Sequence, residues 1–109
     1  MSLLVSLLIS ATAAQAAKAW TPLFNGKDLS GWTQVGPGGF KVENGFLKSY
    51  GGMGLLYWKG GKIGDSVLRV VFKTQGKHDN SGVYIRIPLE PVEPMMPVYY
   101  GYEVQIDAE

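Results

Sequence analysis

The sequence contains no cysteine, which excludes a disulfide framework, a cysteine-ligated metal site and a thiol nucleophile. Charge is also scarce: ten Lys and Arg against nine Asp and Glu give a formal net charge of +1 over 109 residues. The basic residues are spread rather than clustered, so the chain lacks the electrostatic pattern that binding to nucleic acid or an anionic membrane surface requires. The fold must therefore be stabilised by apolar packing.

Long hydrophobic runs are missing too, since no apolar stretch reaches the ~20 residues of a membrane span. The run Leu3–Ile9 is short and is followed by small residues up to Ala17. This order is typical of a signal peptide, and Ala14-Gln15-Ala16 fits the small-x-small cleavage rule. We predict a signal peptide over residues 1–16 and export to the periplasm or the extracellular space. Because no Lys or Arg precedes the run, a membrane-anchored helix and a misassigned start stay open.

Apolar positions at helical spacing are absent after residue 16. Aromatic and β-branched residues instead form short runs separated by Gly, Pro and Asn, which predicts an all-β domain over residues 17–109. Short strands at this spacing are typical of a β-sandwich. The expected strands are Phe40–Val42, Phe46–Tyr50, Leu55–Trp58, Val67–Thr74, Ser81–Ile87 and Tyr99–Ile106.

Two connections can also be predicted. Asn44-Gly45 separates the first two expected strands by two residues, and both central positions of a type I′ turn require positive φ, so these strands should form a hairpin. The segment Pro88–Pro97 contains four prolines, which cannot donate to a β-ladder, so we expect a loop there. The sequence stops directly after its strongest strand pattern, which we interpret as an incomplete sandwich that lacks C-terminal strands.

Three segments carry a specific resemblance: LFNGKDLSGW at Leu23–Trp32, NSGVYIR at Asn80–Arg86 and GYEVQID at Gly101–Asp107. In this order they resemble the N-terminal portion of the 3-keto-disaccharide hydrolase family. The resemblance implies a concanavalin A-like jelly-roll β-sandwich in an exported bacterial protein, with an oligosaccharide or glycoside as its small-molecule substrate. Relatives often have Glu where this chain has Val67 and Val71, and the more apolar strand here predicts deeper burial.

One strand pattern presents a polar face. Side chains alternate along a strand, so Glu103, Gln105 and Asp107 share one face and the apolar residues between them share the other. Taken alone, this pattern is explained most simply by a solvated outer strand. The resemblance adds that related glucanases present Glu-x-Asp-x-Glu on one strand of a concave sheet, a layout that this chain keeps with altered chemistry.

The altered residues argue against ordinary double displacement. Positions four apart in a strand are ~13 Å apart, whereas a retaining glycosidase needs its carboxylates ~5–5.5 Å apart. Asp107 is one methylene shorter than Glu, and Gln105 cannot ionise. A 3-keto sugar offers elimination instead, because its ketone acidifies the C2 proton and the C1 substituent can then leave before water adds back. For this route we predict Glu103 as the base and Asp107 as the acid or its partner.

Further polar residues are candidate substrate ligands, together with Gln105. Arg86 and Tyr84 share a face of the expected strand Ser81–Ile87. Arg86 could bind sugar or enolate oxygens, or form a salt bridge to Glu103 or Asp107, or do both. Lys59 follows the strand Leu55–Trp58, and its side chain faces either the expected substrate cleft of the concave sheet or solvent.

His78 is the single histidine, and a base, a metal ligand and an exposed loop residue are all open interpretations. The chain has neither a His-His spacing nor an Asp-rich calcium loop, so the need for a divalent cation stays undetermined. Six aromatic residues could stack on sugar rings or belong to the core, and Trp32 is best interpreted as a packing anchor. The six are Trp32, Trp58, Tyr50, Tyr57, Tyr99 and Tyr100.

Three classes of function remain from the sequence alone. The first is an exported hydrolase that cleaves 3-keto-disaccharides or other 3-keto-glycosides. The second is a non-catalytic, lectin-like carbohydrate-binding module, which would depend on an exposed aromatic platform rather than on an ionised Glu103. The third is a structural or interaction domain.

Overall fold

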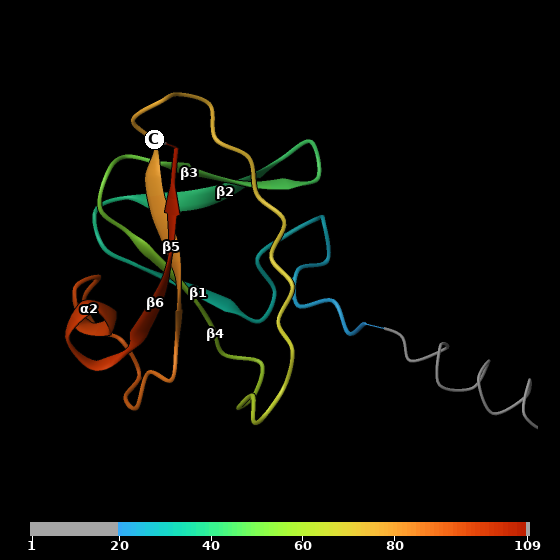
Figure 1. The fold of residues 1–109 in the computed structure, drawn as a ribbon. Coiled ribbons are helices and arrows are strands. Elements are labelled where there is room, and N and C mark those ends of the chain that lie inside the picture. The colour runs from blue at the N-terminus through green and yellow to red at the C-terminus, as the bar shows by residue number, and fades with distance from the viewer. Residues whose placement is uncertain (1–19, 109) are drawn as a thin grey trace, which may run out of the picture.

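The computed structural model describes residues 20–108, so the predicted signal peptide over residues 1–16 lies outside the described part of the chain. These residues are mostly strand and irregular chain, with one short helix, which confirms the predicted all-β class. The strands form three antiparallel pairs, in keeping with a β-sandwich that is not closed. The elements are β1 (Trp32–Val35), β2 (Gly39–Glu43), β3 (Phe46–Tyr50), β4 (Leu55–Trp58), β5 (Asn80–Ile85), α2 (Met96–Tyr100) and β6 (Tyr102–Asp107) (Figure 1).

The first four strands form one hairpin nested inside another. β2 pairs with β3, and β1 pairs with β4 around them. Asn44 and Gly45 have φ of 52° and 79°, so the predicted two-residue turn and the predicted pairing are both confirmed. The Gln34 side-chain oxygen accepts a 2.5 Å hydrogen bond from the Phe40 backbone amide, which ties the outer hairpin to the inner one.

β1 was not among the expected strands, and the motif that precedes it explains its start. The Asn25 side-chain oxygen accepts hydrogen bonds from the backbone amides of Lys27 and Asp28, an Asx-type turn that fixes the chain direction. The Trp32 indole then donates a 2.9 Å hydrogen bond back to the Leu23 carbonyl. The first of the three family-like segments is thus a structural turn, and Trp32 is a packing anchor as predicted.

Trp58 is the packing centre of the nested hairpins. Its ring meets Trp32 edge to face, with centroids 5.2 Å apart, a favoured aromatic geometry. Two glycines flank the same ring: a Cβ at Gly31 would lie 2.5 Å from Trp58 Cζ3, and one at Gly60 would lie 2.6 Å from Cε2. Neither position has room for a side chain, so the two loops close directly on the indole.

β5 and β6 form the third pair, and in Figure 1 they run across the direction of β2 and β3. β5 ends at Ile85, two residues before the predicted end, because Arg86 adopts a φ of 58° that a strand cannot contain. The N-terminal boundary of the last strand was also wrong. Tyr99 and Tyr100 lie in α2, since Pro97 suits the first turn of a helix, and β6 starts only at Tyr102.

The predicted strand Val67–Thr74 was wrong, as this segment pairs with no other strand among residues 20–108. The predicted deep burial was also wrong, because Val67 is 79% exposed and Val71 is 89% exposed. A β-prone pattern becomes a strand only when a neighbouring strand accepts its hydrogen bonds. Instead, the segment is held at its cationic side chains: Arg69 lies over the Trp20 ring at 4.1 Å and Lys73 over the Phe46 ring at 4.9 Å.

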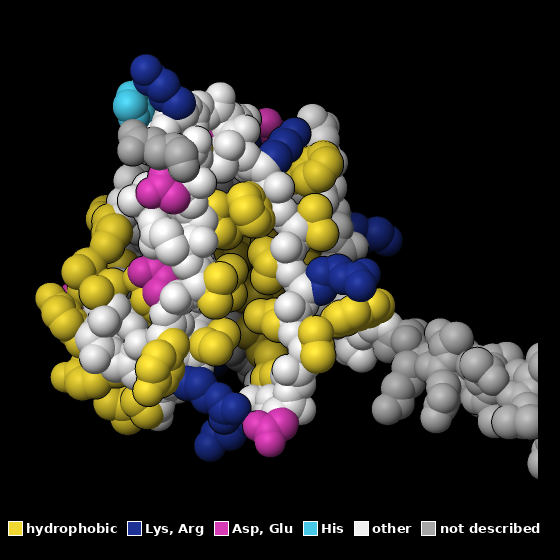
Figure 2. All heavy atoms as spheres, in the orientation of Figure 1, with side chains coloured by type: hydrophobic (Ala, Val, Ile, Leu, Met, Phe, Trp, Pro, Cys, Tyr) yellow, Lys and Arg dark blue, Asp and Glu magenta, His cyan; other side chains and the backbone are white. Residues whose placement is uncertain are grey.

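Between this segment and the strand pairs lies a wide hollow of about 2920 Å³, lined by both apolar and polar residues, with Leu56, Val70 and Val83 among the apolar ones. Figure 2 shows apolar side chains gathered along it. No large apolar side chain of residues 20–108 is fully buried. In the same part of the chain, no helix is both long and apolar enough to cross a membrane.

Candidate functional site

The predicted polar face is present on the β5–β6 pair and is larger than the sequence indicated. Tyr84 pairs with Glu103, Gly82 with Gln105, and Asn80 with Asp107. Cross-strand partners project to the same side of a sheet, so β5 adds Tyr84 and Asn80 to the face of β6. Asn80 was missed as a site residue, because its position depends on the register between the two strands.

Glu103 leans along this face toward its centre. Its direct partner is Tyr84, yet its side chain lies over Gly82, the diagonal neighbour. A Cβ at Gly82 would lie 2.8 Å from Glu103 Cγ and 2.9 Å from Cδ, and it would collide with Oε1. The carboxylate therefore occupies space that a side chain at residue 82 would take. It points toward the Asp107 end of β6.

Tyr84 is a half-buried phenol beside this carboxylate. Burial raises the pKa of Tyr84, and the neighbouring Glu103 carboxylate raises the same pKa further. A phenol so placed keeps its proton at neutral pH and can act as a hydrogen-bond donor. The structure thus brings Tyr84 and Glu103 together, as expected for residues of one site.

Gln105 leans in the same direction as Glu103. Its side-chain amide donates a 2.9 Å hydrogen bond to the Asn80 side-chain oxygen, although its direct partner across the ladder is Gly82. Asp107 lies opposite Asn80 at the end of β6. The polar face therefore runs from Tyr84 and Glu103 at one end, past Gln105, to Asn80 and Asp107 at the other.

Arg86 lies outside this face. Because β5 ends at Ile85 and Arg86 has positive φ, the alternation that was to place Arg86 beside Tyr84 stops before it. The guanidinium forms a 3.1 Å ion pair with Asp65, a partner that the sequence did not suggest. The pair is exposed, so it contributes little stability.

Lys59 belongs to a separate cluster at the end of β4. Its ammonium lies 3.1 Å from a Glu90 carboxylate oxygen, and the same oxygen accepts a 2.7 Å hydrogen bond from the Tyr57 hydroxyl. The contact with Glu90 raises the pKa of Tyr57 and also that of Lys59, while Tyr57 and then Lys59 lower the pKa of Glu90. Glu90 was missed because it lies in the proline-rich loop, distant from β4 in sequence.

His78 lies in the turn that precedes β5, beyond the Asn80 end of the polar face. Asp79 shapes this turn by accepting hydrogen bonds from the backbone amides of Gln75 at 2.6 Å and Gly76 at 3.0 Å, and these bonds lower the pKa of Asp79. Within residues 20–108, no three His, Cys, Asp or Glu side chains are grouped closely enough to hold a metal ion.

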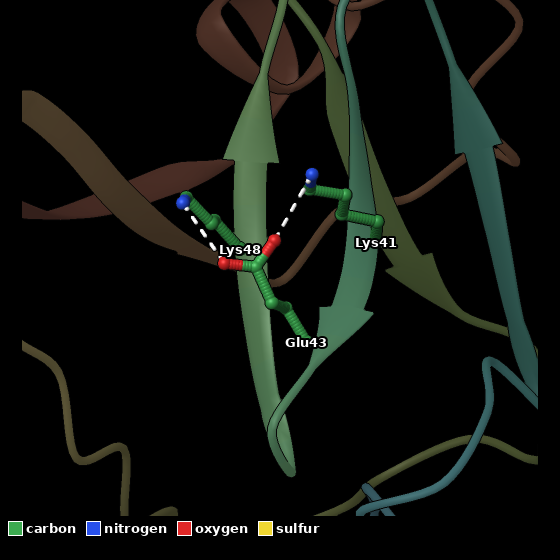
Figure 3. A network of polar contacts seen from close by, with 3 residues as sticks. All are labelled: Lys41, Glu43 and Lys48. Carbon is green, nitrogen blue, oxygen red and sulfur yellow. Dashed lines mark hydrogen bonds and ion pairs between the residues drawn. The ribbon is translucent and has the colours of Figure 1, made fainter.

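A charged network on β2 and β3 is distinct from these candidates. Glu43 bridges Lys41 at 3.0 Å and Lys48 at 3.1 Å (Figure 3). The two lysines are direct cross-strand partners, so their like charges would repel without the carboxylate between them. Contacts with Lys41 and then Lys48 lower the pKa of Glu43. This network stabilises the inner hairpin and contains no residue predicted for the site.

Two exposed tyrosines lie near the start of the polar strand: Tyr99 in α2, and Tyr102 as the first residue of β6, on the face opposite Glu103. Tyr99 is 68% exposed and Tyr102 is 71% exposed. The Tyr99 and Tyr100 rings meet edge to face with centroids 6.4 Å apart. Aromatic side chains presented to solvent in this way are able to stack on sugar rings.

Comparison with protein families gives one match. The model of the 3-keto-alpha-glucoside-1,2-lyase-like domain matches residues 19–109, which confirms the resemblance drawn from the three sequence segments. Searches of curated proteins and of solved structures gave no significant match.

Proposed function

The chain belongs to the family of 3-keto-alpha-glucoside-1,2-lyase-like domains, and we propose from this that it is part of an exported enzyme that cleaves 3-keto-glycosides by elimination followed by hydration. The family is a carbohydrate-related enzyme family. The single observation that supports the finer proposal is the Glu103 carboxylate, which lies over Gly82 at the centre of an exposed polar face.

The proposed reaction begins with proton transfer from C2 of the keto sugar to the Glu103 carboxylate. The C2–H electrons move to the C3 oxygen as an enolate, and the enolate then expels the C1 oxygen substituent, which leaves with a proton from Asp107. Water adds to C1 and transfers a proton to the Asp107 carboxylate, and Glu103, whose carboxyl proton exchanges with solvent, returns a proton to C2. The products are the free 3-keto sugar and the released alcohol, so the net reaction is hydrolysis.

The neighbouring side chains suit this reaction by their chemistry. Tyr84 and Gln105 are neutral donors on the same face as Glu103. Neutral donors can orient hydroxyl and keto oxygens without competing for the proton that the base removes. Asp107 lies at the far end of the face, where it would meet the leaving group of a substrate bound along β6.

The test uses the whole natural protein with 3-keto-trehalose or 3-keto-sucrose in deuterated water. We expect wild type to release free sugar and to incorporate deuterium at C2, and we expect Glu103→Gln to lower kcat by about 10²–10⁴-fold, because the amide cannot accept the proton. Mass spectrometry gives the deuterium content, and the melting temperature of the variant should match that of wild type.

Glu93→Gln is the matched control, because it makes the same chemical change at an exposed carboxylate in the loop before α2. It should keep the wild-type kcat. Release of sugar without deuterium at C2 would contradict elimination and would support direct displacement. Full activity of Glu103→Gln would remove Glu103 from the role of base.

A second candidate function, a lectin-like binding module, is supported by the exposure of Tyr99 and Tyr102. A module of this kind would bind glycosides with the same affinity in wild type and Glu103→Gln, and neither protein would turn them over. Tyr99→Ala and Tyr102→Ala would then weaken binding by roughly 1–3 kcal/mol each, which isothermal titration calorimetry can measure. Turnover by wild type would exclude this alternative as the main function.

A further inference from the structure

Gly82 is an unusual residue for its position. It lies in the interior of β5, where glycine weakens a strand because it gives up more chain entropy than other residues and contributes no packing. Its backbone is not among the glycines with positive φ. Conformation therefore does not require glycine here, and the reason for its presence has to come from the space around it.

That space is filled by Glu103. A Cβ at residue 82 would lie 2.8 Å from Glu103 Cγ and 2.9 Å from Cδ, distances that real side chains do not adopt without movement. Gln105, which faces Gly82 directly across the ladder, is drawn away by its 2.9 Å hydrogen bond to Asn80. Two features thus keep the area over Gly82 open, and the carboxylate enters it.

We propose that Gly82 is a positioning residue: by lacking a side chain, it lets the Glu103 carboxylate lean inward to the point over β5 where the substrate's C2 proton is taken. The inference rests on the proposed function and adds to it the residue that sets the place of the base. With a side chain at residue 82, the carboxylate would stand over Tyr84 at the end of the face, farther from Asp107.

The direction of this lean matters for the reaction. Glu103 and Asp107 lie four residues apart on β6, a separation of ~13 Å between their Cα atoms. One substrate has to present C2 to the first carboxylate and the leaving oxygen to the second, and only C1 separates these two atoms. A Glu103 carboxylate that leans toward Asp107 shortens the distance between the two carboxylates, whereas one that projects straight out from β6 does not.

A double-mutant cycle tests the proposal. Gly82→Ala in the wild-type background should lower kcat about 10²-fold with little change in KM, because a displacement of about 1 Å is enough to cost this much in a proton-transfer step. In the Glu103→Gln background, the same Gly82→Ala change should alter kcat less than about 2-fold, because the base that it displaces is already missing. An equal effect in both backgrounds would overturn the proposal.

Gly64→Ala is the matched control. A Cβ at Gly64 would meet nothing within 4 Å, and Gly64 has no positive φ, so this variant should keep the wild-type kcat. The cycle also distinguishes a wrong role for Gly82 from a wrong role for Glu103. If Glu103→Gln keeps full activity, the proposed base is wrong; if Glu103→Gln is inactive while Gly82→Ala is fully active, only the role of Gly82 is wrong.

Chemical rescue gives a second measurement, which applies even if Gly82→Ala unfolds in the presence of Glu103. In Glu103→Ala, the area over Gly82 is vacated, and added formate should restore part of kcat by acting as the base. In the double variant Gly82→Ala/Glu103→Ala, the new methyl group occupies that area, and rescue by formate should fall at least about 10-fold. Equal rescue of both variants would contradict the proposal.

Discussion

The nested hairpins β1–β4 and the β5–β6 pair differ in how their side chains are used. In the hairpins, Trp32 and Trp58 contact each other and their own loops, so packing determines position. In the β5–β6 pair, Glu103, Gln105 and Val104 are exposed. The first region gains stability from fixed aromatic contacts, and the second keeps its polar groups accessible to a ligand. Under the proposed function, stability and chemistry would therefore depend on different parts of the chain.

In both regions, glycine leaves space for a neighbouring side chain, but the consequence differs between the two regions. Gly31 and Gly60 admit the Trp58 ring, and Gly82 admits the Glu103 carboxylate. In the first case, the missing side chain lets an apolar ring fill the space and adds packing. In the second case, it lets the Glu103 carboxylate extend over β5 and adds no packing. A substitution should therefore affect stability in the hairpins and activity in the β5–β6 pair.

The largest effect on stability is expected from Trp58→Ala. Removing this half-buried ring deletes its contacts with Trp32 and with two loops, and we expect a loss of about 2–3 kcal/mol in the free energy of unfolding. Urea titration followed by circular dichroism measures it. Trp20→Ala, which removes an exposed ring that contacts Arg69, should cost less than about 1 kcal/mol. Equal losses would break the distinction between packed and exposed aromatic residues.

A smaller effect, on the pKa of Tyr57, is expected at the contact between the outer hairpin and the proline-rich loop. Glu90→Gln removes the carboxylate that accepts from Tyr57 and pairs with Lys59. Because Glu90 raises the pKa of Tyr57, the variant should return that pKa toward its ordinary value. NMR titration of the Tyr57 ring between pH 8 and 12 measures the shift. Glu93→Gln, in the same loop, should leave the titration unchanged, and an equal shift in both variants would contradict this assignment.

The smallest effect is expected from Glu43→Gln on the inner hairpin. The pKa of Glu43 is lowered in the folded state by Lys41 and Lys48, so its contribution to stability is present above its unfolded pKa of about 4.3 and is lost as the pH falls through the lower folded value. The variant should be slightly less stable than wild type at pH 7, and the difference should shrink as the pH falls below about 4.3 and Glu43 becomes protonated in the folded state.

Salt provides the control for this last prediction. The network is exposed, so 1 M NaCl should screen it and reduce the difference between Glu43→Gln and wild type at pH 7. Urea midpoints of both proteins at pH 7 and pH 3, with and without salt, give the four differences required. A difference that persists at low pH would assign the role of Glu43 to packing rather than charge.

The sequence predicted local features of the fold better than features that depend on pairing. The Asn44-Gly45 turn and the strands Phe46–Tyr50 and Leu55–Trp58 were predicted correctly, because turn chemistry and alternation lie within a few residues. The segment Val67–Thr74 has an equally strong pattern and is not a strand. Whether such a pattern becomes a strand depends on a neighbour, which its own residues do not specify.

The same limit applies to the candidate site. The shared face of Glu103, Gln105 and Asp107 follows from alternation along one strand and could be predicted. The contribution of Asn80 and the space over Gly82 depend on the register of β5 against β6. Arg86 was assigned to that face by alternation, and its left-handed backbone interrupts the pattern. The catalytic and binding roles of the site residues stay predictions.

The placement of the tryptophans confines one optical signal to the part of the chain that precedes β5. Trp20, Trp32 and Trp58 all precede β5, and the Trp58 indole is enclosed by Gly31, Gly60 and Trp32. Fluorescence emission excited at long wavelength therefore comes from the hairpin residues Trp32 and Trp58 and from the exposed Trp20, whereas β5, α2 and β6 contain no tryptophan. In Trp20→Ala, the remaining tryptophan emission comes from the nested hairpins alone, so melting of the hairpins can be followed without any added label.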